Sequence, residues 1–454
     1  MSAEPLSLSA LQAALNRPLF AEKSWRLSSR PWSLPESALE ELHLIGQACL
    51  AFHQALERLY MKSRLGDRIL RNDDLRVPWV AEYLEAGKPS WLVEHGVAKA
   101  VKGHLPPVLR PDLIVAADGF ALTEMDSVPG GIGLTAFLEE LYLGEDANGM
   151  PKAFLASLAA LIPDKDNPSI SLVVSDEAAT YQPEMEWLAE ILQERGKAIK
   201  VAHPDELEVR SEGVFLRNEQ QDLIYRFWEL FDHEEVPVMR DIAQAAEAGV
   251  VAVTPPMRAF QEEKLALGLF WHHRLEEFWP ENLSKGEWKL LRRIIPKTWI
   301  LDPAELPPGA VLDGPTIGGK QITSWRDLAS ATKKERNLVI KASGFHETAW
   351  GARSVVIGSD VSSEDWAAAI DHALDSFPDP VQVLQEYRKP ALLRHPVYED
   401  DGETTSMEGR LRLSPYYFAS NGQAELSGGL ATFCPADKKI IHGMQDGVLL
   451  PCVI

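Results

Sequence analysis

Residues 110–131 have the sequence RPDLIVAADGFALTEMDSVPGG and have the pattern of two short strands joined by a tight turn. Residues 113–117 form a short apolar run, and residues 120–125 form a second extended run. The Asp-Gly pair between them is a strong turn signal, and the Pro-Gly-Gly at 129–131 ends the second strand. The pattern predicts a β-hairpin with acidic side chains near its open end.

The turn geometry decides whether these acids share one face, and the sequence allows two alternatives. A two-residue turn at the Asp-Gly pair puts Asp112 opposite Met125, and Glu124 and Asp126 then point to the other face. A three-residue loop with a glycine bulge shifts the pairing by one residue. Asp112 then faces Glu124, and Arg110 faces Asp126, all on one side.

The second alternative brings three carboxylates and one guanidinium together. Hard cations such as Mg²⁺ bind oxygen ligands of this kind and complete their coordination with waters or phosphate oxygens. An ordinary acidic hairpin with its charges in solvent is the competing explanation.

The hairpin begins with Arg-x-Asp, continues with Glu-x-Asp twelve residues after the first Asp, and is followed by Pro-Gly. This order resembles the metal-binding end of the ATP-grasp ligases, among them D-alanine–D-alanine ligase. The resemblance implies that Asp112, Glu124 and Asp126 hold Mg²⁺ ions that bridge the phosphates of ATP. It implies that Arg110 stabilises the charge of the reacting phosphoryl group. Most members of the family have Asn where this chain has Asp126.

Three later segments carry candidate nucleotide-binding residues. Lys264 precedes a helical run at 265–274, and a solvated helix lysine is its alternative role. Lys341 ends the apolar run LVIK, which favours a buried strand that carries an ammonium group into a site. The loop from Gly344 to Gly351 follows it, and glycines let backbone N–H groups approach phosphates. A plain hairpin with a solvent-facing lysine is the alternative for Lys341.

The stretch PVQVLQEYRKP at 380–390 predicts a strand that runs into a proline-terminated linker. In ATP-grasp proteins the backbone of such a linker binds the adenine edge, and the resemblance assigns this role to Gln385, Glu386 and Tyr387. An ordinary strand end is the alternative.

The order of these motifs indicates a circular permutation. In most ATP-grasp proteins the metal-binding hairpin follows the two lysines and the linker, whereas here it precedes them. The chain therefore resembles a circularly permuted ATP-grasp protein of the glutathionylspermidine synthase-like group. The SGGLATF stretch at 427–433 is similar to that group as well.

The 454 residues are 45% hydrophobic and 25% charged, which is typical of a globular protein of two or three domains. The net charge of −22 argues against binding to nucleic acid or an anionic membrane. We find no membrane-spanning stretch and no signal peptide. Three cysteines far from one another indicate a reducing compartment, so we expect a cytoplasmic protein. The sequence gives no indication of its oligomeric state.

We expect an α/β (α+β) protein with four parts. Residues 1–105 form a helical N-terminal region, and residues 106–150 form the metal-binding hairpin segment. Residues 165–258 alternate strands and helices and predict a small α/β domain with a mainly parallel sheet. Residues 259–454 form the nucleotide-binding portion, in which the acidic stretch at 398–408 is expected to be an exposed connection.

The segment GPTIGGK at 314–320 has P-loop spacing, but we reject it. Gln321 replaces the Ser or Thr that binds Mg²⁺, and no convincing strand precedes the segment.

The resemblance implies an ATP-dependent ligase that joins a small-molecule or peptide carboxylate to an amine through an acyl phosphate. A phosphotransferase on the same ATP site and a non-catalytic binding protein that keeps the fold are the alternatives.

Overall fold

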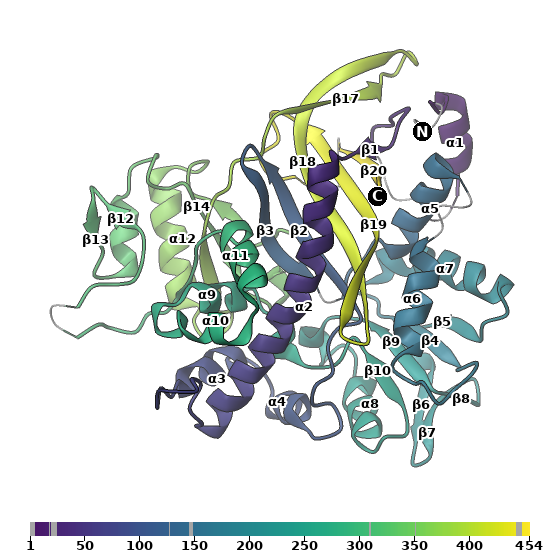
Figure 1. The fold of residues 1–454 in the computed structure, drawn as a ribbon, viewed down its shortest axis with the longest axis horizontal. Helices are drawn as coiled ribbons and strands as arrows, with labels where there is room; N and C mark the ends of the chain where they lie inside the picture. The colour runs from purple at the N-terminus through teal and green to yellow at the C-terminus, as the bar shows by residue number, and fades with distance from the viewer. Residues whose placement is uncertain are drawn as a thin grey trace.

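The computed structural model describes residues 5–17, 19, 25–126, 128–144, 149–307, 310–349, 351–441 and 447–454. Three larger sheets form the centre of the molecule, and helices pack around them (Figure 1). The N-terminal helices are α1 (Leu8–Leu15), α2 (Glu36–Leu65), α3 (Pro78–Glu85) and α4 (Ser90–Val97).

The seven-stranded sheet, called the central sheet from here on, combines the predicted hairpin with strands from the C-terminal end of the chain. Its order is β1 (Trp32–Ser33), β20 (Val448–Val453), β19 (Gln423–Pro435), β18 (Thr404–Ser420), β2 (Val108–Ala116) and β3 (Gly119–Asp126), and β17 (Leu393–Tyr398) also pairs with β18. The hairpin β2–β3 thus lies beside strands about 300 residues away in sequence, and this is visible where dark blue meets yellow in Figure 1.

The hairpin register corrects our expectation in one respect and confirms it in another. Ala116 pairs with Gly119, so the turn consists of residues 117 and 118, and neither predicted turn is right. Asp112 nevertheless faces Glu124, and Arg110 faces Asp126, as the second alternative required. The one-residue shift comes from a bulge at Thr123 inside β3, so the register changes within the strand and not at the turn.

Long α2 packs along the central sheet, and α5 (Ile132–Leu143) and α6 (Gly149–Ala159) also pack on it. The side chains of Leu42, Ile45, Phe52 and Leu56 are buried, which explains the helical spacing of apolar residues in this region. Tyr417 of β18 donates a hydrogen bond of 2.6 Å to the backbone oxygen of Leu42.

The small parallel sheet is present as predicted. Its order is β10 (Ala252–Thr254), β9 (Leu223–Phe227), β4 (Ile170–Val174) and β5 (Ile199–Ala202), and every pairing in it is parallel. Helices α7 (Gln182–Glu194) and α8 (Val238–Glu247) accompany it. The sequence did not predict the antiparallel meander β6 (Leu207–Arg210), β7 (Gly213–Leu216) and β8 (Glu219–Gln221).

A third sheet contains the two segments expected to bind nucleotide. It is antiparallel, in the order β11 (Thr298–Leu301), β16 (Gln382–Glu386), β14 (Leu338–Ala342) and β15 (Val356–Ile357). The remaining elements are α9 (Leu265–Trp271), α10 (Phe278–Asn282), α11 (Lys285–Ile294), α12 (Ser363–Asp375) and the short hairpin β12 (Thr316–Ile317) and β13 (Lys320–Gln321).

The acidic stretch at 398–408 is exposed as expected, and residues 399–403 form a connection outside the strands, but the stretch is a connection only in its first half. Its second half belongs to β18, where Thr404 pairs with Tyr398 and Met407 pairs with His395. The ladder hydrogen bonds with β17 hold this segment, and its acidic side chains lie on an exposed edge where charge is compatible with strand structure.

One hydrophobic core joins the N-terminal helices to the rest of the molecule. Its buried side chains come from α2, the central sheet, the parallel sheet and α9–α11, and smaller cores lie under α8 and α12. The N-terminal helical region therefore shares its core with the sheets. Among the described residues, no helix has the length and apolarity needed to cross a membrane.

We predict that Gly46→Ala destabilises the protein. Helix α2 packs so closely on β18 that a Cβ atom at residue 46 would lie 2.2 Å from the Tyr417 ring. We expect a loss of about 1–3 kcal/mol in the free energy of unfolding, measured by chemical denaturation. The matched control is Gly286→Ala, because Gly286 is a helical glycine whose added Cβ would meet only Ser284 Oγ at 4.0 Å, so it should tolerate the methyl group. Equal stability of the two variants would contradict the packing argument.

Glu139 of α5 is a buried carboxyl under β19. Its Oε2 atom has no hydrogen-bond partner, and burial raises the pKa of the group to about 8. The pKa of Glu139 in the folded protein lies above the value of about 4.3 expected in the unfolded chain. The free energy of unfolding therefore falls as the pH rises from the unfolded pKa through the folded one.

We therefore predict that Glu139→Gln stabilises the protein at pH 8 by about 1 kcal/mol or more, and that this gain disappears near pH 4. Thermal unfolding from pH 4 to pH 9 measures the difference. Glu425→Gln, at an exposed position of β19, should show no such pH-dependent gain. A gain that is constant with pH would contradict a raised pKa.

Candidate functional site

The open end of the β2–β3 hairpin places Arg110 against Asp126. The two side chains make an ion pair of 2.8 Å, and Arg110 also donates to the backbone oxygen of Gly130 at 2.8 Å. Asp126 accepts a second hydrogen bond, from the backbone N–H of Val128 at 3.0 Å. Arg110 is thus fixed in position, while the side chain of Asp126 keeps 29% of its surface exposed.

Asp112 is more enclosed than the other two acids, with a side chain only 2% exposed. Ser414 of β18 donates to its Oδ1 atom at 2.8 Å, and the Arg110 Nε atom lies 3.4 Å from the same oxygen. Arg412, also on β18, pairs with Oδ2 at 3.2 Å. Both oxygens of Asp112 therefore already have partners.

The two predicted lysines converge on β3. The Lys264 ammonium lies 3.2 Å from Glu124, and Lys341 donates at 2.6 Å to the backbone oxygen of Thr123. Lys341 also donates to the side chain of Gln385 at 3.1 Å. Lys264 lies 140 residues after Glu124 in the sequence (264 − 124 = 140), and Lys341 lies later still, so the fold brings distant segments together at β3.

The electrostatics of the site follow from burial and these pairs. Burial alone would raise the pKa of Glu124, but Lys264 and then Lys341 outweigh it and lower that pKa to about 2. Burial lowers the pKa of Lys341 to about 8. Burial also raises the pKa of Asp126, although Arg110 partly opposes this shift. Glu124 is therefore an ionised carboxylate whose side chain is 33% exposed.

The loop after Lys341 packs closely against the segment that carries Lys264. A Cβ atom on Gly344 would lie 2.6 Å from the backbone oxygen of Glu262, so only glycine fits there. Gly351 has φ +64°, which also favours glycine. Lys264 donates to the backbone oxygen of Ala349 at 3.2 Å, which ties the loop to the site. Residue 350 within this loop lies outside the described residues.

The predicted linker lies at the end of β16. Gln385 is buried and bridges Lys341 and Thr298, to which it donates at 2.9 Å. The backbone N–H groups of Glu386 and Tyr387 are already used, by the backbone oxygens of residues 297 and 337. Asn337 also donates to the Tyr387 carbonyl oxygen at 3.1 Å, so a ligand would have to displace one of these contacts.

The carboxyl end of the parallel sheet contributes charged residues that sequence reasoning missed. Arg226 of β9 is fully buried and holds three backbone oxygens and Glu262. Burial, and after it the charges of Glu262 and Asp126, together raise the pKa of Glu229 to about 8. Ligands of α/β proteins bind at the carboxyl edge of the parallel sheet. The position of these residues at the ends of predicted strands could therefore have identified them from the sequence.

Arg412 and Ser414 were also missed. The sequence feature that could have identified them is the alternation RLRLS at 410–414, because alternation places every second side chain on one face of a strand. Only the pairing of β18 with β2 shows that this face is the one that carries Asp112.

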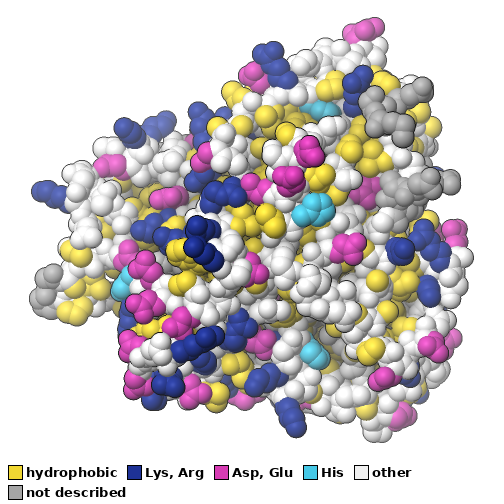
Figure 2. Space-filling model, viewed as in Figure 1, with side chains coloured by type: hydrophobic (Ala, Val, Ile, Leu, Met, Phe, Trp, Pro, Cys, Tyr) yellow, Lys and Arg dark blue, Asp and Glu magenta, His cyan; other side chains and the backbone are white. Residues whose placement is uncertain are grey.

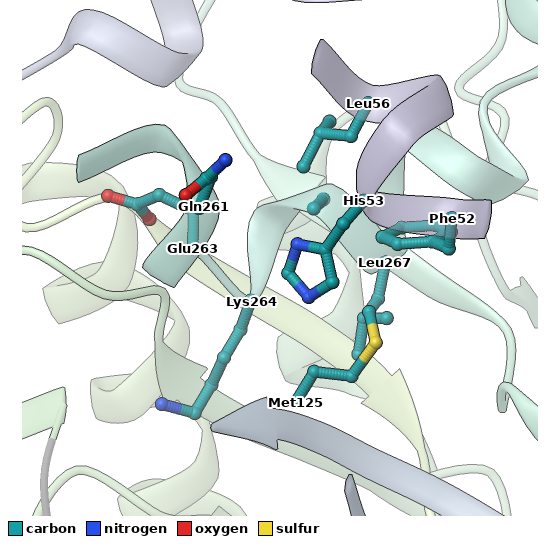
Figure 3. A pocket seen from close by; sticks show the side chains of 9 residues that line it. Phe52, His53, Leu56, Met125, Gln261, Glu263, Lys264 and Leu267 are labelled. Carbon is teal, nitrogen blue, oxygen red and sulfur yellow. The ribbon is translucent and has the colours of Figure 1, made fainter. Parts of the chain in front are cut away.

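A small pocket lies behind β3, on the side of α2 (Figure 3). His53 lines it together with Met125, Gln261 and Glu263, while the Lys264 ammonium points away from the imidazole ring. The ring is 1% exposed, and neither nitrogen has a hydrogen-bond partner. Burial lowers its pKa to about 4, so His53 is neutral at pH 7. The pocket has room for little more than a water molecule.

The rejected P-loop segment lies away from these residues, on the hairpin β12–β13. Gly318 and Gly319 form its turn with positive φ angles, and Lys320 is exposed. The Gly318 N–H donates at 2.6 Å to Glu335 of the protein itself. The hairpin therefore lacks the strand-to-helix geometry of a P-loop.

The described residues contain no preformed group of three metal-ligating side chains. Glu124 and Asp126 are the two accessible carboxylates of the hairpin, and Mg²⁺ is commonly held by one or two carboxylates plus substrate phosphates. Charged side chains of both signs are interspersed over the face drawn in Figure 2.

Solved structures that match this chain have low sequence identity to it. A glutathione synthetase-like effector from Globodera pallida, in its apo form, matches 97% of this chain and 95% of its own, with 13% identity and a TM-score of 0.55. A candidate gamma-glutamylcysteine synthetase from Methylobacillus flagellatus matches 84% and 82%, with 13% identity and a TM-score of 0.41. D-alanyl-alanine synthetase A from Vibrio cholerae matches 63% and 88%, with 15% identity and a TM-score of 0.26.

The first of these matches shows that the chain shares the fold of that glutathione synthetase-like protein, and the other two superpose too poorly to add to it. No protein-family model and no curated protein sequence matches the chain.

We predict that Lys341→Ala weakens binding of a non-hydrolysable ATP analogue by about tenfold or more, because its ammonium group is delivered into the site by β14. Lys320→Ala should leave the affinity unchanged. Calorimetric titration with the analogue and Mg²⁺ measures both. If Lys320→Ala were the damaging change, the nucleotide would bind elsewhere.

Proposed function

We propose that this protein is an ATP-dependent carboxylate–amine ligase that forms an amide or peptide bond through an acyl phosphate. The observation that carries the proposal is the convergence of Lys264 and Lys341 on β3, next to the carboxylates of Glu124 and Asp126. The fold shared with a glutathione synthetase-like protein supports it.

The nucleotide would lie between the central sheet and the antiparallel sheet. Lys264 and Lys341 would exchange their present partners for phosphate oxygens, with the loop from Gly344 to Gly351 beside them. The backbone of residues 385–387 would contact the adenine. Burial destabilises the charged form of Lys341 and lowers its pKa, so an anionic phosphate would stabilise the ammonium group.

Magnesium fits the carboxylates that are accessible. Glu124 and Asp126 would hold it, and Asp112 would contribute only after releasing Arg412 or Ser414. When bound, the metal would neutralise charge on the triphosphate. Arg110 would stabilise the transferring phosphoryl group, because Asp126 and the Gly130 carbonyl already fix its guanidinium in place.

The carboxyl end of the parallel sheet lies next to this site. Arg226 pairs with Glu262 there, and Glu229 lies within electrostatic range of Glu262 and Asp126. With a pKa raised to about 8, Glu229 is a protonated carboxyl at neutral pH and would hydrogen-bond an amine rather than attract it by charge.

The permuted order is part of the proposal. The hairpin precedes the lysines by more than 100 residues in the chain yet lies beside them in space, as in the glutathionylspermidine synthase-like group. Small-molecule or peptide substrates and a cytoplasmic location are consistent with the charge and cysteine content.

A mass-spectrometric screen tests the function. Carboxylates such as amino acids, γ-glutamyl peptides and glutathione are paired with amines in the presence of Mg-ATP, and products are scored for condensation with loss of water. ADP and phosphate released only with both substrates support the ligase. A phosphorylated product would establish a phosphotransferase instead, and failure to bind Mg-ATP would indicate a non-catalytic protein.

We predict that Glu124→Gln lowers ATP turnover by about 100-fold or more without unfolding the protein, because the charge that faces Lys264 and the metal is lost. Turnover is measured by ADP release, and folding by circular dichroism. Asp118→Asn, at the exposed turn of the same hairpin, is the matched control and should keep normal turnover. Normal turnover in a folded Glu124→Gln protein would refute the metal assignment.

A further inference from the structure

A buried ion pair joins the N-terminal helical region to the segment that carries Lys264. The Lys88 ammonium contacts the Glu263 carboxylate, and each of the two side chains is only 3% exposed. Lys88 lies in the turn between α3 and α4, where Gly87 has φ +71° and Pro89 precedes the first residue of α4. Each charge depends on the other, because a buried charge that loses its partner is strongly destabilised.

The same carboxylate anchors the start of the loop that follows Lys341. The Ser343 hydroxyl donates to Glu263, and the backbone N–H of Phe345 donates to it at 3.4 Å. Ser343 in turn accepts a hydrogen bond of 2.8 Å from the backbone N–H of Leu265. Glu263 therefore fixes the start of this loop against the segment that leads into α9.

The Phe345 side chain gives the loop a direct contact with Lys88. The Lys88 ammonium lies 5.4 Å from the centroid of the Phe345 ring, within the range of a cation–π contact. His233 stacks on the same ring at 6.0 Å between centroids, and Phe345 packs against the smaller core under α8. Lys88 therefore contacts both the loop and the carboxylate that anchors the loop.

The ion pair also affects the charges around Lys264. Burial lowers the pKa of Lys264, but the carboxylates of Glu124, Asp126 and Glu263 raise it above its ordinary value. Glu263 thus competes with Glu124 for the Lys264 ammonium. Because Lys88 neutralises Glu263 at direct contact, it weakens this competition and favours the pairing of Lys264 at β3.

We propose that Lys88 is a positioning residue of the nucleotide site and acts by holding the loop at 343–349 through Glu263. The proposal rests on the ATP-dependent function proposed above and makes the N-terminal helical region part of that site. The loop directly follows Lys341, and its Ala349 carbonyl oxygen accepts from Lys264 at 3.2 Å. A displaced loop would therefore disturb the geometry of the groups expected to bind the phosphates.

Hydrogen–deuterium exchange of the full-length protein without nucleotide tests the position of the loop. In Lys88→Met, which keeps an unbranched side chain but removes its charge, the amides at 343–349 should exchange about tenfold faster or more. The amides of β18 and β19 should exchange as in wild type. Unchanged exchange of the loop would overturn the proposal. An equal rise in both regions would overturn it too, because it would indicate general destabilisation.

Arg64→Met is the matched control. Arg64 of α2 pairs with Glu85 of α3 and Glu94 of α4, each at 2.6 Å, so its loss loosens the same helical region without removing the partner of Lys88. This variant should have a lower unfolding midpoint but the loop exchange of wild type. Loop exchange as fast as in Lys88→Met would mean that any loosening of the region frees the loop, and the specific role of Lys88 would be overturned.

Calorimetric titration with a non-hydrolysable ATP analogue and Mg²⁺ measures the consequence for binding. Lys88→Met should weaken binding by about fivefold or more, whereas Arg64→Met should bind as wild type does. Wild-type affinity in a Lys88→Met protein whose loop exchanges faster would overturn the positioning role. Absence of binding by wild type would refute the ATP-dependent function itself, whereas the exchange result is obtained without nucleotide and does not depend on it.

A double variant keeps the test decisive if Lys88→Met does not fold because Glu263 is left without its partner. Lys88→Met combined with Glu263→Gln removes both buried charges. The donors of Ser343 and Phe345 then meet a neutral amide oxygen, which binds them less strongly than a carboxylate does. The loop should therefore still exchange faster than in wild type, and wild-type exchange in a folded double variant would overturn the proposal.

Discussion

The three carboxylates at the open end of the β2–β3 hairpin are neutralised by cations, two of which come from other parts of the chain. Taking a charge out of water costs several kcal/mol unless a partner accompanies it, so these acids need their cations nearby. The pairs are Asp112 with Arg412, Glu124 with Lys264, and Asp126 with Arg110. Two of them link separate elements, so charge compensation constrains how β18 and the segment before α9 approach the hairpin.

The same constraint explains which parts of the site could be predicted from sequence. Strand and turn signals are local, and they located the hairpin, the parallel strands and the strand that ends at Lys341. The bulge at Thr123 has no local signal, because its residue type is ordinary for a strand. The sequence could therefore indicate that the acids might face one another, but not that the shift occurs inside β3.

Residues that depend on strand pairing were beyond sequence reasoning. Arg412 becomes part of the site only because β18 pairs with β2, across a separation of 300 residues (412 − 112 = 300). The acidic stretch after Tyr398 was misjudged for a related reason. Its composition is typical of a loop, yet pairing with β17 makes its second half a strand. In both cases a partner strand outweighed local preference, a distant one for Arg412 and a neighbouring one for this stretch.

Burial decides which charges of the site can act on a ligand. Lysines and the accessible acids lie at β3, and further acids lie at the carboxyl end of the parallel sheet. The raised pKa of Glu229 keeps this group protonated at neutral pH, and Glu262 is paired with Arg226, so these two acids carry little free negative charge. Glu124 is ionised beside Lys264, so the charge that a metal or a phosphate would meet lies at β3.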